Sequence, residues 1–215
     1  MSKKVSRFLD RLRSSIASSP GRPVKDPEMI TVVSGLPRSG TSMMMKMLDA
    51  GGLAPLTDEI RTADADNPKG YYEFERVKKL DKGDTAWVPQ ARGKAVKVIA
   101  ALLQHLPPDQ RYKVIFMRRS IDEILRSQKQ MLIRRGEPTD KVSDEELSAL
   151  FHKHLNHTTS WLEKQPNIEV IYVSYNDMLS NPAPQVRQIN QFLGGGLDVD
   201  KMVGVVDPNL YRQRQ

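Results

Sequence analysis

Short apolar runs recur along the chain and alternate with segments of helical periodicity. Four runs are rich in β-branched residues and have the length of buried strands, at residues 29–34, 95–100, 112–117 and 168–173. Helical patterns lie between the third and fourth runs, at residues 121–135 and 143–164, and after the fourth run, at residues 184–193. Ser143 and Glu146 have the spacing of a capping box. Strands that alternate with helices predict an α/β fold with a central parallel sheet flanked by helices.

The first strand runs directly into a glycine-containing loop. Residues 34–45 read SGLPRSGTSMMM, and Gly35 and Gly40 have the spacing of a P-loop, G-x-x-x-x-G-K-[ST]. Residues 41–50 have helical composition and are followed by two glycines. Such a strand, loop and helix form a site for a tetrahedral anion, because the unpaired amides and the helix dipole favour negative charge. Ligands of parallel sheets bind beyond the carboxyl ends of the strands, where this loop falls.

The cations around this loop differ from those of a nucleotide-triphosphate site. Thr41 stands where a P-loop has its Lys, and the loop's cation is Arg38. The third strand ends in Arg118 and Arg119, where an NTPase has an Asp for Mg²⁺. Ser127 follows Arg119 by eight residues, so both side chains can face one phosphate. The two sites predict one ligand with two separated anionic groups and no metal.

The length and composition favour a single domain. A chain of 215 residues has room for one α/β domain, which we place at residues 29–215 after a basic tail or linker at residues 1–28. No apolar run approaches the roughly 18 residues of a transmembrane segment, and the basic start lacks the apolar core of a secretory signal. The sequence has no Cys, which excludes disulfides and thiolate metal sites. We therefore expect a cytoplasmic protein.

The formal net charge of +7 suits an anionic partner. Helix-turn-helix, zinc-finger and RNP signatures do not accompany it, and an aromatic content of 6% is low for a base-stacking surface. His152, His154 and His157 do not share a helical face, which argues against a metal site. We expect local anion sites, with neither nucleic acid nor a metal as a partner.

Four segments resemble motifs of the sulfotransferases that use 3′-phosphoadenosine 5′-phosphosulfate (PAPS), and they occur along the chain in the same order as in that family. The 5′-phosphosulfate loop of that family is similar to PRSGTS, which comprises Pro37, Arg38, Ser39, Gly40, Thr41 and Ser42. Its strand with a Lys near the transferring sulfuryl group is similar to VKVIAALLQHLPP, which includes Lys97. Its 3′-phosphate site is similar to RRSIDEILRS, with Arg119 and Ser127. Its tyrosine-containing segment near the adenine is similar to YNDMLSNPAPQVRQINQFLG, with Tyr175. The resemblance covers residues 29–196.

The resemblance implies a P-loop-like three-layer fold and metal-independent, in-line transfer of a sulfuryl group to a hydroxyl or amine acceptor. It implies that Arg38, Lys97 and the loop amides hold the sulfuryl group in line and stabilise the negative charge that develops on the leaving bridging oxygen. A sulfuryl donor has no γ-phosphate and needs no Mg²⁺. The resemblance therefore explains why the Lys and the Asp of an NTPase are both missing.

Two positions differ from the cytosolic branch of that family. The catalytic His that follows the strand Lys by two residues is replaced by Ile99. The Gly-rich C-terminal segment that contacts the 3′-phosphate is absent, and Arg212, with Tyr211 or Arg214, is our candidate substitute. The proton of the acceptor must therefore be taken by a residue other than this His.

An acidic residue is the candidate base. Glu59 is our first choice, because the tyrosylprotein sulfotransferases are similar in having a Glu at the matching place after the loop. Glu73 is the second choice, in a segment whose Tyr71 and Tyr72 are candidates for the acceptor wall, and Asp58 is the third.

Two other classes of protein stay open at this point. A P-loop nucleotide kinase would need Mg²⁺-dependent ATP binding, and a nucleotide-binding protein without turnover would keep the fold alone. The acceptor class is equally open among sugars, phenols, lipids and peptides, and a homodimer is possible.

Overall fold

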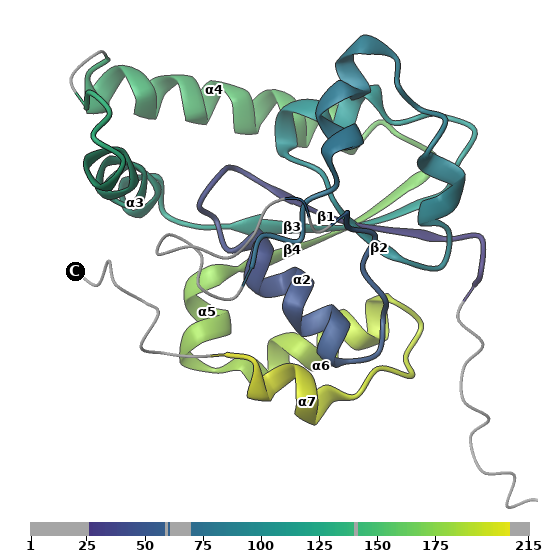
Figure 1. The fold of residues 1–215 in the computed structure, drawn as a ribbon. Helices are drawn as coiled ribbons and strands as arrows, with labels where there is room; N and C mark the ends of the chain where they lie inside the picture. Colours follow the sequence, from purple (N-terminus) through teal and green to yellow (C-terminus); the bar gives the residue numbers. More distant parts are fainter. Residues whose placement is uncertain (1–25, 59, 61–69, 140–141, 207–215) are drawn as a thin grey trace, which may run out of the picture.

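A four-stranded parallel sheet forms the centre of the structure (Figure 1), a computed structural model that describes residues 26–58, 60, 70–139 and 142–206. The strands, β1 (Ile30–Gly35), β2 (Ala95–Lys97), β3 (Tyr112–Arg118) and β4 (Ile168–Ser174), have the order β2-β1-β3-β4. All neighbouring pairs are parallel. The carboxyl ends of all strands therefore meet at one edge of the sheet, and the predicted parallel α/β fold is confirmed.

Helices cover both faces of this sheet, which makes three layers (Figure 1). The α-helices are α2 (Thr41–Ala50), α3 (Ile121–Arg134), α4 (Asp144–Leu162), α5 (Tyr175–Ser180), α6 (Pro182–Phe192) and α7 (Val199–Gly204). Between β1 and β3 in sequence, the described residues form three 3₁₀ helices, η1 (Glu75–Lys82), η2 (Val88–Ala91) and η3 (Ala100–His105). The helices α2, α5, α6 and α7 lie on one side of the sheet, and α4 lies on the other.

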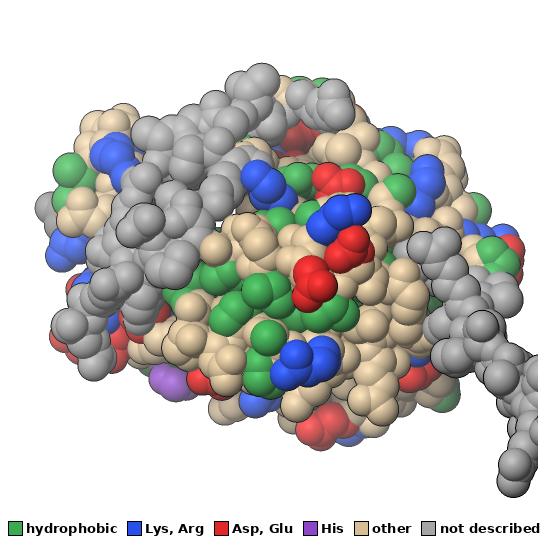
Figure 2. All heavy atoms as spheres, turned by 90° about the horizontal axis from the view of Figure 1, so that it is seen from below, with side chains coloured by type: hydrophobic (Ala, Val, Ile, Leu, Met, Phe, Trp, Pro, Cys, Tyr) green, Lys and Arg blue, Asp and Glu red, His purple; other side chains and the backbone are tan. Residues whose placement is uncertain are grey.

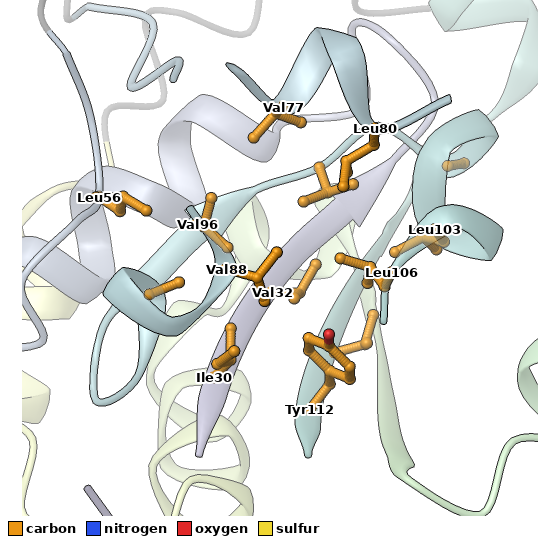
Figure 3. Packing of buried hydrophobic residues seen from close by; sticks show 14 of the residues in the cluster. Ile30, Val32, Leu56, Val77, Leu80, Val88, Val96, Leu103, Leu106 and Tyr112 are labelled. Carbon is orange, nitrogen blue, oxygen red and sulfur yellow. The ribbon is translucent and has the colours of Figure 1, made fainter. Parts of the chain in front are cut away.

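Two hydrophobic cores, one on each face, follow from the alternation of side chains along β1. Ile30 and Val32 face a core that includes residues of the 3₁₀ helices and Leu162 of α4. Figure 3 shows Val32 between Val88 and Leu106 in this core. Val33 faces the opposite core, which is rich in Met because four methionines of α2 and α7 (Met44, Met45, Met47 and Met202) pack there with no exposed surface.

The predicted elements are confirmed, with one strand shorter than expected. The apolar run at residues 95–100 forms a strand only over Ala95–Lys97, and η3 begins at Ala100. Val98 still donates to the carbonyl oxygen of Val33, but the chain then turns into η3, which buries Leu103 completely. The helix predicted at residues 143–164 is α4, and its capping box is present: the Ser143 hydroxyl accepts from the Glu146 amide and the Glu146 carboxylate accepts from the Ser143 amide.

Sequence periodicity missed the short elements α5, α7 and the 3₁₀ helices, because these span too few turns for a pattern of 3.6 residues to repeat.

Figure 2 shows the face that carries α2, α6 and α7, where Lys and Arg side chains are mixed with Asp and Glu. Among the described residues, no helix is long and apolar enough to cross a membrane.

Candidate active site

The glycine loop, residues 35–42, connects β1 to α2 at the carboxyl edge of the sheet. Gly35, Arg38 and Gly40 have φ angles of 147°, 69° and 97°. Positive φ is easy for glycine, but it costs a residue with a side chain about 1–2 kcal/mol. Contacts from other segments of the chain must therefore stabilise the backbone conformation at Arg38.

Both glycines are required by close packing as well as by φ. A Cβ at Gly35 would lie 2.5 Å from Ser39 Oγ and 2.8 Å from the carbonyl oxygen of Met117, at the end of β3. A Cβ at Gly40 would lie 2.4 Å from Cδ2 of Tyr175. The loop is thus pressed against β3 and against the first residue of α5.

The loop and the start of α2 offer donors for an anion. Gly40 is the N-cap of α2 and supplies no side-chain hydrogen bond, and the first turn has no acidic residue. The amides of that turn and the helix dipole therefore favour an anionic ligand. Ser39 is 1% exposed, and its buried hydroxyl has no hydrogen-bond partner in the described part of the chain. A buried hydroxyl without a partner inside such a loop fits a phosphate or sulfate oxygen as its missing partner.

Hydrogen bonds of two arginines connect one end of the loop to α3 and to the end of β3. The side chain of Arg38 donates from Nε to Ser127 Oγ over 3.0 Å, across 89 residues of sequence. Arg119, at the end of β3, donates from Nη1 to the carbonyl oxygen of Arg38, also over 3.0 Å. The structure thus brings Arg38, Arg119 and Ser127 together, and the last two are nearly buried.

Arg119 is held in addition by an ion pair and a ring contact. Its Nε donates to Glu123 Oε2 over 2.7 Å, and Asn176 Nδ2 donates to the other oxygen of Glu123 over 2.9 Å. The guanidinium lies 4.4 Å from the ring centre of Tyr175. Burial raises the pKa of the Tyr175 phenol, and Glu123 raises it further, whereas Arg119 and Arg38 oppose this effect. The phenol is therefore neutral at physiological pH, and its ring packs between the loop and the guanidinium.

The other end of the loop faces Lys97, the last residue of β2. Its side chain is 9% exposed, and its Nζ donates to the carbonyl oxygen of Tyr71 and lies 3.4 Å from Ser42 Oγ. The Ser42 hydroxyl donates to the same carbonyl over 3.3 Å. Glu73 lies next to this group, with Oε1 3.5 Å from Lys97 Nζ. Lys97, Ser42 and Glu73 therefore form a second cluster beside the start of α2.

The three acidic candidates have different surroundings. Asp58 accepts hydrogen bonds from the amides of Ile60 and Glu75, so its carboxylate holds the backbone of this segment together. Glu73 is half-buried between Lys97 and Lys78, whose Nζ lies 3.5 Å from Oε2. Glu59, our first choice, lies outside the described residues.

The remaining predicted residues lie around these two clusters or beyond the described part. Pro37 is exposed at the tip of the loop and Thr41 begins α2. Arg212, with Tyr211 and Arg214, lies outside the described residues. In the described segments, no three His, Cys, Asp or Glu side chains are placed to share a metal ion.

Sequence reasoning missed Glu123, Asn176 and the carbonyl of Tyr71. Glu123 follows Arg119 by four residues, which is the spacing of a helical ion pair and was a usable signal. The contacts of Asn176 and of the Tyr71 carbonyl span 53 and 26 residues, and no local pattern announces them.

A parallel α/β sheet carries an anion-binding loop at its carboxyl edge, and arginines stand where an NTPase has its Mg²⁺ ligand, so the site belongs to an α/β protein that binds anionic ligands in a different way from an NTPase. The sulfotransferase domain family matches residues 29–210, and the chain belongs to this family. It is a PAPS-dependent sulfotransferase, and nothing in the described site supports a kinase.

Solved structures of similar fold include two mycobacterial enzymes. Sulfotransferase STF9 from Mycobacterium avium is 13% identical with a TM-score of 0.52, over 98% of this chain and 73% of that one. Sulfotransferase STF1 from Mycobacterium tuberculosis is 15% identical with a TM-score of 0.51, over 94% of this chain and 74% of that one. These likenesses show the fold. No curated protein matches the chain by sequence.

Proposed function

We propose that this sulfotransferase transfers the sulfuryl group of PAPS to a hydroxyl acceptor, with each end of the glycine loop serving one anionic group of the donor. The observation that carries this proposal is the pair of cationic clusters at the two ends of one loop. Arg38, Arg119 and Ser127 form the first cluster, and Lys97 and Ser42 form the second. Two separated anions on one nucleotide match this arrangement.

The first cluster would hold the 3′-phosphate, together with Arg212 from beyond the described residues. The amides at the start of α2 and the side chains of Ser39 and Thr41 would hold the 5′-phosphosulfate. Tyr175 was predicted near the adenine. Its buried ring beneath Gly40 supports a role in shaping the loop beside the nucleotide.

The donor, when bound, supplies an activated sulfuryl group. Lys97 would stabilise negative charge on the bridging oxygen, because its ammonium is nearly buried beside the loop and is therefore weakly screened. Arg38 was predicted to share this role, but because its Nε donates to Ser127 we propose it for the 3′-phosphate cluster instead. The clusters orient the reacting groups and thus lower the entropic part of the barrier.

The acceptor hydroxyl must lose its proton as it attacks, and a carboxylate is the base that we propose. Glu59 stays our first choice, on the resemblance described above. Glu73 is supported by its place beside Lys97, where an acceptor bound near the sulfuryl group would come within reach. Asp58 loses support, because backbone amides already occupy both of its oxygens.

The acceptor-binding segment, the assembly and the cellular compartment are also proposals. Residues 53–72 would form the acceptor wall, with Tyr71 and Tyr72 at its end. An amine acceptor and a homodimer remain compatible with the site. The basic tail at residues 1–28, the catalytic domain at residues 29–215 and the cytoplasmic location stay predictions from the sequence.

A calorimetric titration tests the donor assignment. The protein would be titrated with adenosine 3′,5′-bisphosphate (PAP) in EDTA, and in parallel with ATP and Mg²⁺. We expect PAP to bind without metal and ATP to bind much more weakly, because the end of β3 carries arginines where an NTPase has its Mg²⁺ ligand. Tight ATP binding that requires Mg²⁺, with no binding of PAP, would contradict the proposal.

A further inference from the structure

Glu123 is a buried carboxylate that the proposed function does not use. It lies in the first turn of α3, and its side chain is 4% exposed. A carboxylate at this depth is stable only with strong partners, because burial removes its hydration. Arg119 Nε occupies one oxygen at 2.7 Å and Asn176 Nδ2 occupies the other at 2.9 Å. Glu123 therefore connects the end of β3 to the start of α5.

This connection fixes the plane of the Arg119 guanidinium. A guanidinium is planar and rigid, so a hydrogen bond at Nε and a second at Nη1 determine its orientation. The first goes to Glu123 and the second goes to the carbonyl oxygen of Arg38. The face of the guanidinium packs on the ring of Tyr175, 4.4 Å from its centre.

The contact with Arg38 falls at the strained point of the glycine loop. Arg38 has a φ of 69°, and its carbonyl oxygen accepts the bond from Arg119. The side chain of Arg38 reaches Ser127 on the same helix as Glu123. Asn176 follows Tyr175 directly, and the Tyr175 ring supports Gly40 from below. The contact of Glu123 with Arg119 thus reaches the loop directly, and its contact with Asn176 reaches the residue next to Tyr175.

We infer that Glu123 and Asn176 are positioning residues for the sulfuryl donor. They act through Arg119, which they hold against the loop, and they need not touch the donor themselves. Asn is suited to position 176 because its amide donates to Glu123, whereas a carboxylate there would repel it. The inference rests on the proposed function, since it concerns the same donor site.

An exchange of the carboxylate and the amide group between positions 123 and 176 tests this inference. Glu123→Gln removes the negative charge that pairs with Arg119, and Asn176→Asp places two carboxylates together. We expect each single variant to weaken PAP binding about tenfold or more, as measured by calorimetry, because a charge-assisted hydrogen bond to the loop's anchor is lost. In the double variant, the new amide at position 123 can accept from Arg119 and donate to the new carboxylate at position 176. PAP affinity should therefore largely recover.

Matched controls separate positioning from folding. Asp122→Asn removes an exposed carboxylate from the same helical turn and should leave PAP affinity unchanged. If Glu123→Gln does not fold, Asn176→Ala replaces it as the test variant, because position 176 is only half-buried and the change removes the donor to Glu123. In steady-state kinetics, the variants should raise KM for PAPS more than they lower kcat, because they weaken binding of the donor and of the transition state alike.

The outcomes are distinguishable. Unchanged PAP affinity in the folded single variants, or no recovery in the double variant, would overturn the inference while PAP binding by the wild type upholds the proposed function. A wild-type protein that does not bind PAP would overturn both. Loss of thermal stability without a change in PAP affinity would show that Glu123 only supports the fold.

Discussion

Single residues at this site have roles that depend on neighbours distant in the sequence. Ile99 stands at the position of a family histidine, and its hydrocarbon side chain has no group for proton transfer. Glu73, 24 residues from Lys97, lies 3.5 Å from its ammonium. We therefore propose that the base is a carboxylate from the segment between α2 and η1.

Substitution of the candidate bases identifies which one acts. Glu59→Gln and Glu73→Gln should each be assayed for kcat and for PAP affinity. The true base should lose about 10²–10⁴-fold in kcat while PAP affinity is kept, because the amide cannot take a proton. Glu75→Gln is the matched control, since this carboxylate pairs with Lys78 and not with Lys97. Full turnover in both variants would show that neither carboxylate is the base.

Gly40 gives a second prediction at this scale. Gly40→Ala should abolish PAP binding and destabilise the protein, because the new methyl group would lie 2.4 Å from Tyr175. Gly52→Ala is the matched control: its φ of 92° is similar, but no atom lies within 4 Å of the added carbon. We expect the control to cost about 1–2 kcal/mol in the free energy of unfolding and to keep PAP affinity. Equal effects in the two variants, measured by urea denaturation and calorimetry, would contradict the packing argument.

At the scale of elements, each strand end delivers one part of the site. The end of β1 carries the glycine loop, β2 ends in Lys97, and β3 ends next to Arg119. The start of α5, directly after β4, carries Tyr175 and Asn176. Because the strands are parallel, these segments lie at one edge although up to 140 residues separate them in sequence.

The capping box of α4 allows a prediction about an element remote from the site. Ser143→Ala should lower the free energy of unfolding by about 1 kcal/mol, because the Glu146 amide loses its acceptor. Ser148→Ala, within the same helix, should be neutral or slightly stabilising, since Ala has the higher helix propensity. Urea denaturation measures both values, and PAP affinity should stay unchanged. A larger loss in Ser148→Ala than in Ser143→Ala would refute the cap.

At the scale of the whole molecule, the sheet places β1 between β2 and β3. This order sets Lys97 on one side of the glycine loop and Arg119 on the other, so the loop receives a cation from each neighbouring strand. The two hydrophobic cores keep the sheet rigid beneath these groups. This topology suits an elongated anionic nucleotide that lies across the carboxyl edge, as proposed above.

The sequence by itself determined the class of fold and the family. Strand and helix periods, the spacing of Gly35 and Gly40, and the absence of a P-loop Lys are local properties, because they follow from backbone sterics and side-chain pattern over a few residues. The residues that contact the loop from β2 and β3 could be named in advance, since strand ends converge in any parallel sheet.

Only the tertiary structure decided how these residues are connected. The approach of Arg38 to Ser127 spans 89 residues, and the burial of Glu123 between Arg119 and Asn176 joins two separate strand ends. Such contacts depend on how helices pack on the sheet, which no short-range pattern encodes. The same packing engages Asp58 with backbone amides and brings Glu73 to Lys97, so the fold supports Glu73 as a base and weakens Asp58 without changing their order.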